Sequence, residues 1–532
     1  MSQPWGFPCK GGLNVNLNQL EMLSQPGFAT RLRNFEVDPD GGYRRVDGFT
    51  QFGDTSPNGS EVVLGMAVYA DGIIVCSGTG IFFSQDGEST WLQINRASVS
   101  GSGDNYSTFT GRSLAARTSQ GRCTFALYEG TSDYGELVIC DGVNEPFLFQ
   151  MTGTDSDITN RTFFAKEITV SGTTGPAVGV IHDKHLVVAG ASTAKNTIFY
   201  SGTNDIDDFT STGSGSIVIS DAVVGLASFR SDLIIFCTNS IHKLVNINDS
   251  SNVAVVPITT NVGCLSGGSI QEIGGDLLFL SPDGVRTVAG TARIGDVELG
   301  SVSRQIQSIV SDIAADKDYI ITSAVLRSKS QYRLFYSKNS ESPTIARGII
   351  GTLTANGFAW SETLGVQALG FVSDLDKDGI EKVYHGDKDG YIYNHLSGNS
   401  FSNAGSARNI DAVYQTPDFD FGDVGTRKTL KYARVSFSPE GAVEPSFRVR
   451  YDYEDPAIPQ PEPFAVSTIA LPAIFGSSAF NAVTFGATSD PMERITLEGS
   501  GNTCSFRITS DDQKSAYAVN GLYIDYMPSG RR

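Results

Sequence analysis

A pair of short apolar runs separated by a tight turn recurs along most of this chain. The first run of each pair has three to five apolar residues, and the second is often aromatic. The first runs begin near residues 72, 137, 186, 233, 277, 333 and 383. Apolar runs this short, bounded by turn residues, predict strands rather than helices.

The spacing between these runs predicts how the strands are organised. Successive runs lie roughly 44 to 65 residues apart, close to the period of propeller blades. In such an array each unit buries its apolar face against its neighbours. The uneven spacing fits blades with loop insertions. We therefore predict an all-β chain with an irregular β-propeller of six to seven blades over residues 61–400.

Residues 1–60 have a different pattern. Residues 34–37 alternate as a strand, and a second strand resumes at Tyr43. The turn between them contains Pro39, which fixes φ, and two glycines, which allow positive φ. We predict an N-terminal β arm with a hairpin that leads into the first blade.

The pattern changes again after a Ser-, Asn- and Gly-rich stretch at residues 396–409. Longer alternating strands follow at residues 432–437, 446–453, 494–497, 505–509 and 522–526. Alternation of this kind is typical of half-buried strands in a sandwich. We predict a C-terminal β-sandwich over residues 401–532.

One segment has helical spacing. Apolar residues fall at positions 302, 306, 309, 310 and 313, after Ser301 or Ser303 as the N-cap. A connector packed on the core is the favoured interpretation. A helix that binds a partner or faces a lumen is the alternative.

The charge and the cysteine content limit the kinds of function that fit this chain. The 532 residues carry a formal charge of -19, and no basic stripe is visible. A protein that grips nucleic acid needs such a stripe, whereas an acidic wall lets DNA slide past. The seven cysteines form no C-x-x-C pair, so we expect reduced, buried thiols made in a cytosol. We expect neither a signal peptide nor a transmembrane segment.

One acidic stretch resembles a calcium loop. Asp374, Asp376 and Asp378 alternate and are followed by Gly379, a pattern that can converge on a hard cation. The twelfth position, which is Glu in an EF-hand, is His385 here. Strands flank the stretch, and similar turns occur at residues 281–284 and 387–390. An acidic hairpin turn is therefore favoured over a metal site.

No motif argues for catalysis. Residues 84–91 resemble the Asp-box of sialidase-type propellers but carry Glu88 where that motif has Gly, and the box is structural in those enzymes. No P-loop, nucleophile elbow or dinucleotide fingerprint is present. We predict a protein that is not an enzyme, with no catalytic residues and no cofactor.

The arm carries a resemblance to a known family. Residues 11–14, 34–37 and 40–49 resemble the opening of tail proteins from tailed bacteriophages. The order of parts is similar to that of podovirus short-tail nozzle, or packaged-DNA stabilisation, proteins, which have a β-propeller followed by a β-rich domain. Three further segments are similar: residues 200–209, 301–306 and 414–428.

The resemblance implies a virion tail component assembled in the host cytoplasm. It implies a homohexamer below the portal and adaptor, with tail fibres or tailspikes as neighbours. The acidic channel would retain the genome and then conduct it into the host without specific binding. We expect arm residues to contact other subunits or the adaptor, namely Asn34, Phe35, Tyr43, Arg44 and Arg45. Removal of residues 1–48 should then abolish tail incorporation and leave a folded propeller.

Two other classes stay open. One is a carbohydrate-binding or carbohydrate-cleaving propeller, such as a phage receptor-binding protein. The three tryptophans, Trp5, Trp91 and Trp360, are few for a sugar platform. The other class is a scaffold propeller that binds protein partners.

Overall fold

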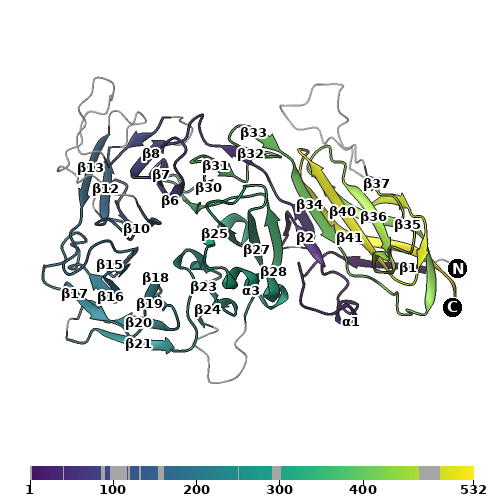
Figure 1. The fold of residues 1–532 in the computed structure, drawn as a ribbon, viewed down its shortest axis with the longest axis horizontal. Coiled ribbons are helices and arrows are strands. Elements are labelled where there is room, and N and C mark those ends of the chain that lie inside the picture. Colours follow the sequence, from purple (N-terminus) through teal and green to yellow (C-terminus); the bar gives the residue numbers. More distant parts are fainter. Residues whose placement is uncertain are drawn as a thin grey trace.

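The computed structural model consists of a ring of small sheets beside a two-sheet sandwich (Figure 1). It describes residues 3–39, 41–85, 90–95, 117, 120–130, 133–153, 161–249, 251–289, 301–466 and 492–531. The described chain is all-β apart from a few short helices. The fold class predicted from the sequence is confirmed.

Four consecutive four-stranded blades form the first part of the ring. The first comprises β6 (Val63–Tyr69), β7 (Gly72–Ser77), β8 (Gly80–Gln85) and β9 (Leu92–Gln93). The second comprises β10 (Thr124–Tyr128), β11 (Glu136–Cys140), β12 (Phe147–Thr152) and β13 (Thr162–Glu167). The third comprises β14 (Val178–His182), β15 (His185–Ala191), β16 (Ala194–Tyr200) and β17 (Gly215–Val218). The fourth comprises β18 (Val223–Phe229), β19 (Asp232–Cys237), β20 (Ile241–Val245) and β21 (Ala254–Thr259).

Three more sheets complete the ring. A smaller, three-stranded one comprises β22 (Gln271–Ile273), β23 (Asp276–Ser281) and β24 (Gly284–Thr287). The next blade comprises β25 (Ile320–Leu326), β26 (Gln331–Ser337), β27 (Arg347–Thr354) and β28 (Gly357–Leu364). The last comprises β29 (Gly370–Leu375), β30 (Glu381–Gly386), β31 (Ile392–His395) and β5 (Phe49–Gln51), with β32 (Phe401–Asn403) and β33 (Ser406–Arg408) beyond β5. Six four-stranded blades and one smaller sheet agree with the predicted six to seven.

An N-terminal strand holds the last blade. β5 pairs antiparallel with β31, so that Phe49 lies opposite His395. The Phe49 ring is buried and stacks on Phe401 at 5.0 Å between centroids. On the other side of this blade, β29 packs against β6 of the first blade. The ring is therefore closed by residues from both ends of the propeller sequence.

The sandwich has two sheets, and the arm contributes to both. One comprises β1 (Gln3–Pro8), β3 (Phe35–Val37), β4 (Tyr43–Arg45), β35 (Thr426–Pro439), β38 (Met492–Thr496), β39 (Ser500–Gly501) and β41 (Tyr517–Arg531). The other comprises β2 (Arg31–Arg33), β34 (Ile410–Gln415), β36 (Ser446–Tyr451), β37 (Phe464–Ala465) and β40 (Cys504–Asp512). Strands from both sheets bury their side chains in one apolar cluster.

The arm strand β2 joins the propeller to the sandwich. It runs parallel to β28, with Arg33 opposite Glu362, and antiparallel to β34, with Arg31 opposite Gln415. A nine-stranded sheet therefore continues from a propeller blade into the sandwich. The arm predicted over residues 1–60 supplies four sandwich strands as well as β5. Removal of residues 1–48 would take these four strands out of the sandwich, so that truncation does not isolate a docking role.

The helices are short. Those in the described residues are α1 (Gln19–Met22), η2 (Gly267–Ser269), η3 (Arg304–Ile306), α3 (Gln307–Ala315), η4 (Arg327–Lys329) and η5 (Asp452–Glu454). In the described part of the chain, no helix is long and apolar enough to cross a membrane.

The segment with helical spacing forms η3 and α3. Ile306, Val310 and Ile313 are buried in the main core cluster, which matches the favoured core-packed connector. Of the two expected N-caps, Ser303 occupies the N-cap position of η3. Ser303 precedes η3, but its side chain makes no cap bond and instead accepts a hydrogen bond from the Val285 amide at 2.9 Å.

We expect Phe49→Ala to weaken the closure of the ring. Removal of this buried ring should lower the free energy of unfolding by about 3–5 kcal/mol. Chemical denaturation, together with hydrogen exchange of the β31 amides, measures the change. The matched control is Thr50→Ala on the same strand, where the exposed side chain should contribute less than about 1 kcal/mol. Equal losses in the two variants would contradict this role of β5.

Candidate functional site at the arm junction

The β3–β4 hairpin sorts its side chains onto two faces. Glu36 lies opposite Arg44, and Phe35 lies opposite Arg45. Side chains alternate along a strand, so Glu36 and Arg44 share one face while Phe35 and Arg45 share the other. The turn closes with Gly42 at a φ of 107°, which favours glycine.

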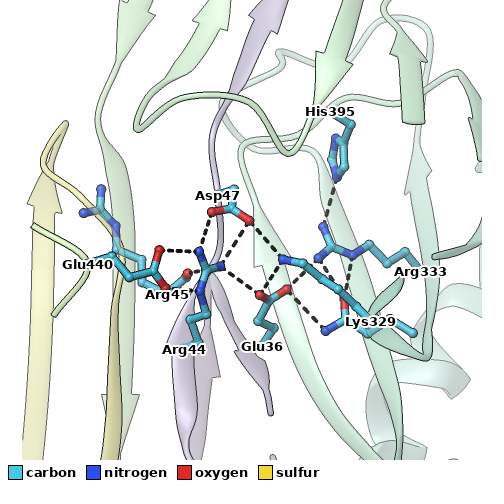
Figure 2. A network of polar contacts seen from close by, with 9 residues as sticks. Glu36, Arg44, Arg45, Asp47, Lys329, Arg333, His395 and Glu440 are labelled. Carbon is cyan, nitrogen blue, oxygen red and sulfur yellow. Dashed lines mark hydrogen bonds and ion pairs between the residues drawn. The ribbon is translucent and has the colours of Figure 1, made fainter. Parts of the chain in front are cut away.

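Glu36 is the centre of a buried ionic network (Figure 2). Its side chain is 4% exposed. One carboxylate oxygen accepts from Arg44 Nη1 at 2.9 Å and from Lys329 Nζ at 2.7 Å. The other accepts from Arg333 Nη2 at 2.7 Å and from Gln331 Nε2 at 3.3 Å. The carboxylate therefore bridges the arm to one propeller blade.

Two further carboxylates complete the network. Asp47 accepts from Arg44 Nη2 at 2.7 Å and from Lys329 Nζ at 2.9 Å. Glu440 accepts from Arg44 Nε at 2.5 Å and from Arg44 Nη2 at 2.8 Å, a two-pronged contact with the sandwich. The network holds three carboxylates and three cations, so its formal charge is balanced: Glu36, Asp47, Glu440, Arg44, Lys329 and Arg333.

The surrounding charges keep Glu36 and Asp47 ionised. Burial alone would raise the pKa of Glu36, but Arg333, Lys329 and Arg44 outweigh it and lower that pKa. Burial also opposes ionisation of Asp47, whose pKa is nevertheless lowered by Arg44 and Lys329. At neutral pH these carboxylates therefore stay charged, and the network connects the parts through ion pairs instead of exchanging protons.

A pair of buried histidines extends the network into the last blade. Arg333 Nη1 lies 3.0 Å from His395 Nε2, and His395 Nδ1 lies 3.2 Å from His385 Nδ1. A guanidinium can only donate, so His395 Nε2 accepts and His395 is neutral with its proton on Nδ1. Burial lowers the pKa of His385 to about 3. Burial, His385 and Arg333 hold the pKa of His395 well below its usual value.

The five arm residues predicted to meet partners make contacts within the chain. Asn34 adopts a φ of 53°, and its side-chain amide donates to the Leu364 carbonyl at 3.0 Å and to the Asp411 carbonyl at 2.9 Å. These carbonyls lie on the propeller side and the sandwich side of β2. Arg44 belongs to the ionic network described above. Asn34 and Arg44 thus both bridge the two parts.

The other three predicted residues lie in or beside the sandwich core. The Phe35 ring packs edge-on against Tyr517 at 5.8 Å between centroids. The Tyr43 hydroxyl donates to the Gly27 carbonyl at 2.6 Å, and Arg45 Nη1 donates to Asp512 at 2.8 Å. All three side chains are buried. The structure therefore gives the hairpin an intramolecular role.

Sequence reasoning missed most of the ionic network. The residues it did not name are Glu36, Asp47, Lys329, Arg333 and Glu440. One signal was available: the hairpin register places opposite charges at Glu36 and Arg44 directly across the two strands. The remaining partners are distant in sequence and carry no local signal.

The acidic stretch at Asp374, Asp376 and Asp378 forms a hairpin turn. Asp376 accepts from the Asp378 and Ile380 amides, each at 2.9 Å. Asp378 is paired with Lys377, and Asp374 accepts from Arg327. Among the described residues, no group of three or more potential ligands that could hold a metal ion is found.

A second turn repeats this geometry. Asp387 accepts from the Asp389 and Tyr391 amides, each at 2.9 Å. Its other oxygen accepts from the Tyr393 hydroxyl at 2.7 Å. In both turns one aspartate, Asp376 or Asp387, accepts from the amides two and four residues ahead. The alternating aspartates are thus explained by turn formation.

Two further expectations from the sequence concern the cysteines and the Asp-box-like segment. All seven cysteines are free, and six are buried while Cys123 is half-buried. The Asp-box-like segment reaches residues 86–89, which lie outside the described residues.

A cavity of about 500 Å³ lies at the propeller axis. It is lined by the innermost strands of the ring, including β6, β10, β14, β18, β25 and β29, together with η2. A smaller cavity of about 410 Å³ lies beside the ionic network and includes Glu36, Asp47 and Lys329 in its wall.

Comparisons with known proteins identify no family for this chain. No family model and no curated protein matches the sequence. The extracellular domain of a hybrid two-component system from B. thetaiotaomicron is 9% identical, with 65% of this chain and 39% of that chain covered and a TM-score of 0.36. The Neurospora crassa Pan2 WD40 domain is 8% identical, with 67% and 98% covered and a TM-score of 0.37. The designed Ika8 protein is 10% identical, with 65% and 100% covered and a TM-score of 0.33.

This chain spans about two fifths of the length of the bacterial extracellular domain. Similarity at these TM-scores carries no argument about function. The propeller described above is defined by its own strand pairing.

We expect Glu36→Gln to destabilise the protein strongly. It leaves three cations facing two carboxylates in a buried site, which should cost about 3–5 kcal/mol of unfolding free energy. Chemical denaturation measures the loss, and Glu272→Gln on the exposed side of β22 is the matched control. Adding Arg333→Met should recover part of the loss, because it removes an unpaired buried charge. Additive losses in the double variant would contradict the coupling.

We expect stability to fall as the pH drops below about 6.5. The unfolded histidines then bind protons that neutral, buried His385 and His395 do not, so each can remove up to about 1.4 kcal/mol per pH unit. This window lies above the range in which Glu36 and Asp47 titrate. Unfolding curves between pH 7 and 5 measure the slope.

The variant His385→Phe keeps a ring beside Tyr393, which His385 contacts at 4.9 Å. Because the variant lacks one histidine, its unfolding free energy should fall less steeply as the pH drops, by up to about 1.4 kcal/mol per pH unit. Parallel curves for the variant and the parent protein between pH 6.5 and 5 would contradict the assignment.

Proposed function

We propose that this chain is a structural component of a bacteriophage short tail, in the nozzle below the portal and adaptor. The observation that carries the proposal is the location of the tail-like arm sequence. Residues 34–37 and 41–49, which lie within the segments that resemble tail proteins, form the hairpin and the link to β5 that connect the sandwich and the propeller. A stiff two-part unit is what a conduit under genome pressure requires.

Two of the shorter tail-like segments also make contacts between positions that are distant in the sequence. In residues 301–306, the Val302 carbonyl accepts from the buried Trp360 indole at 2.8 Å. In residues 414–428, Lys428 donates to the Asn502 carbonyl at 3.0 Å inside the sandwich. These tail-like segments thus contribute hydrogen bonds that hold the structure together.

The genome would pass between copies rather than through one propeller. A cavity of about 500 Å³ is far too small for a DNA duplex. Six copies related by rotation would close a ring through head-to-tail contacts and enclose a wider lumen. With a formal charge of -19 per chain, such a lumen repels phosphates, so that DNA is held and then conducted without specific binding.

Contacts with other tail parts would use surfaces outside the buried hairpin. In the arm, the exposed Leu20 on α1 is such a surface, with 80% of its area accessible. The adaptor, the portal, tail fibres or tailspikes and neighbouring copies are the proposed partners. The proposal places assembly in the host cytoplasm and assigns no catalytic residue or cofactor.

The packing of two of the three tryptophans favours this proposal over a carbohydrate-binding or carbohydrate-cleaving propeller. Trp360 is fully buried. Trp5 packs against Phe7 and Phe419 with ring centroids 5.1 and 4.6 Å apart. Neither is presented as an open platform for a sugar ring.

We expect phage particles that contain this chain to carry six copies in a ring at the distal part of a short tail. Mass spectrometry of purified particles measures its presence, and cryo-electron microscopy measures its position and copy number. Particles of an unrelated tailed phage, purified in the same way, are the control. A peripheral position on a spike or fibre would instead support receptor binding, to be followed by a glycan array. Absence from the particles would reject the tail proposal.

A further inference from the structure

Three arginines form a row across one sheet of the sandwich. The row crosses four neighbouring strands, β2, β34, β40 and β36 (Figure 1). Arg31 lies opposite Gln415, and Gln415 lies opposite Arg507. Arg507 in turn lies directly opposite Arg448. These positions are far apart in the sequence, which explains why no basic stripe is visible there.

The row faces away from the sandwich core. The residues beside its members on their strands are buried in the main core cluster, among them Leu32, Tyr414, Phe447 and Phe506. Successive side chains of a strand point to opposite faces, so the arginines point outward. Arg31 is exposed, and 35% of the Arg448 side chain is accessible. Both ends of the row are therefore open to a partner.

The chain compensates these positive charges only in part. Arg450 lies two residues from Arg448 on β36 and shares its face. Among the described residues, Glu454 is the one carboxylate that forms an ion pair with these four arginines, at 3.9 Å from both Arg448 and Arg507 and in closer contact with Arg450. Burial lowers the pKa of Arg507, and the other three arginines lower it further, while Glu454 raises it. Like charges directly across two strands are destabilising unless an anion accompanies them.

A strained turn holds Glu454 against the arginines. Asp452, Tyr453 and Glu454 adopt positive φ angles of 48°, 59° and 61°. A left-handed turn of three residues that are not glycine is costly. Asp452 stabilises it by accepting hydrogen bonds from two consecutive backbone amides, at 2.7 and 3.0 Å. In the described chain Glu454 pairs with three of the four arginines and not with Arg31, so it shows a carboxylate bound at one end of the row only.

We propose that this row docks a short acidic segment of a partner protein in an extended conformation. Neighbouring strands are about 4.8 Å apart, so the row from Arg31 to Arg448 spans about 14 Å. An extended segment of five residues has about the same length. Carboxylates near its two ends pair with Arg31 at one end and with Arg448 and Arg507 at the other. This surface stands independently of the tail proposal.

The charge of the whole chain favours an acidic segment over nucleic acid. The formal charge is -19, so a long polyanion is repelled beyond the row, whereas a short segment meets only the row. The part of the sandwich sequence outside the described residues, 467–491, contains one acidic residue, Asp490. That stretch therefore offers little charge with which to neutralise the arginines.

Fluorescence anisotropy of a rhodamine-labelled peptide with the full chain tests the surface. The peptide has five residues, with glutamates at alternate positions and serines between them. We expect a dissociation constant of about 0.1–1 mM at low salt, reasonable for a few ion pairs on an open face. Salt at about 1 M should abolish binding, because it screens charges beyond about 3 Å.

Two further probes decide what the surface recognises. The same peptide with glutamines in place of glutamates should bind at least about tenfold more weakly, because it forms no charge-assisted hydrogen bonds. Equal binding of the two peptides, or no binding of the glutamate peptide at about ten times the expected concentration, would overturn the proposal. Tighter binding of a short oligothymidylate than of the glutamate peptide would indicate a nucleic-acid surface and would also overturn it.

Paired substitutions locate the bound peptide. Arg31→Gln together with Arg448→Gln removes both ends of the row and should weaken binding at least about tenfold. The matched control, Lys431→Gln together with Arg434→Gln, removes two exposed cations from β35 in the other sandwich sheet and should leave binding unchanged. Equal losses in the two double variants would contradict the assignment.

A variant of Glu454 gives the opposite readout. Glu454→Gln should tighten binding of the glutamate peptide about threefold or more, because three arginines lose their partner within the chain. This variant decides the question if the double arginine variant does not fold. Unchanged or weaker binding in Glu454→Gln would show that the peptide binds elsewhere and would overturn the proposal.

Discussion

The joint between the two parts of this protein depends on a buried carboxylate at Glu36. Bringing that charge out of water is expensive, and the cost is recovered only when cations from the arm and the propeller surround it. Through Arg44 the same network also contacts the sandwich at Glu440. The charge of this network is balanced only when every partner is present. Any other register between the two parts would leave a buried charge unpaired, so alternative registers are disfavoured.

The backbone of the arm connects the same two parts as the ionic network. Arm strands fill positions in both sandwich sheets and in the last blade, so the apolar core and the ionic network act at the same boundary. Asn34, at a positive φ, reaches carbonyls on both sides of that boundary. Apolar packing supplies most of the stabilisation, whereas these polar contacts define the geometry of the joint.

Local patterns in the sequence predicted local structure well. The alternating runs predicted the propeller strands, and the turn residues between Val37 and Tyr43 predicted the β3–β4 hairpin. The aspartates at Asp376 and Asp387 are explained as turn residues by the same short-range chemistry. What the sequence did not reveal is long-range: Glu36 and Arg333 are separated by 297 positions. Nothing near either residue indicates that pairing, and the arm's place within the sandwich was hidden for the same reason.

The pairing of β1 with β41 has a consequence for the order of folding. Residues 3–8 pair with residues 521–526 on β41 (Figure 1). β3 and β4 also lie in the sheet that contains β41. On the ribosome the arm is made before the propeller, and its partner β41 is made after it. Its strands must stay unpaired while the whole propeller is synthesised, and such contacts of high sequence separation form slowly. The arm strands are therefore open to chaperones and to neighbouring nascent chains for as long as the propeller takes to be made.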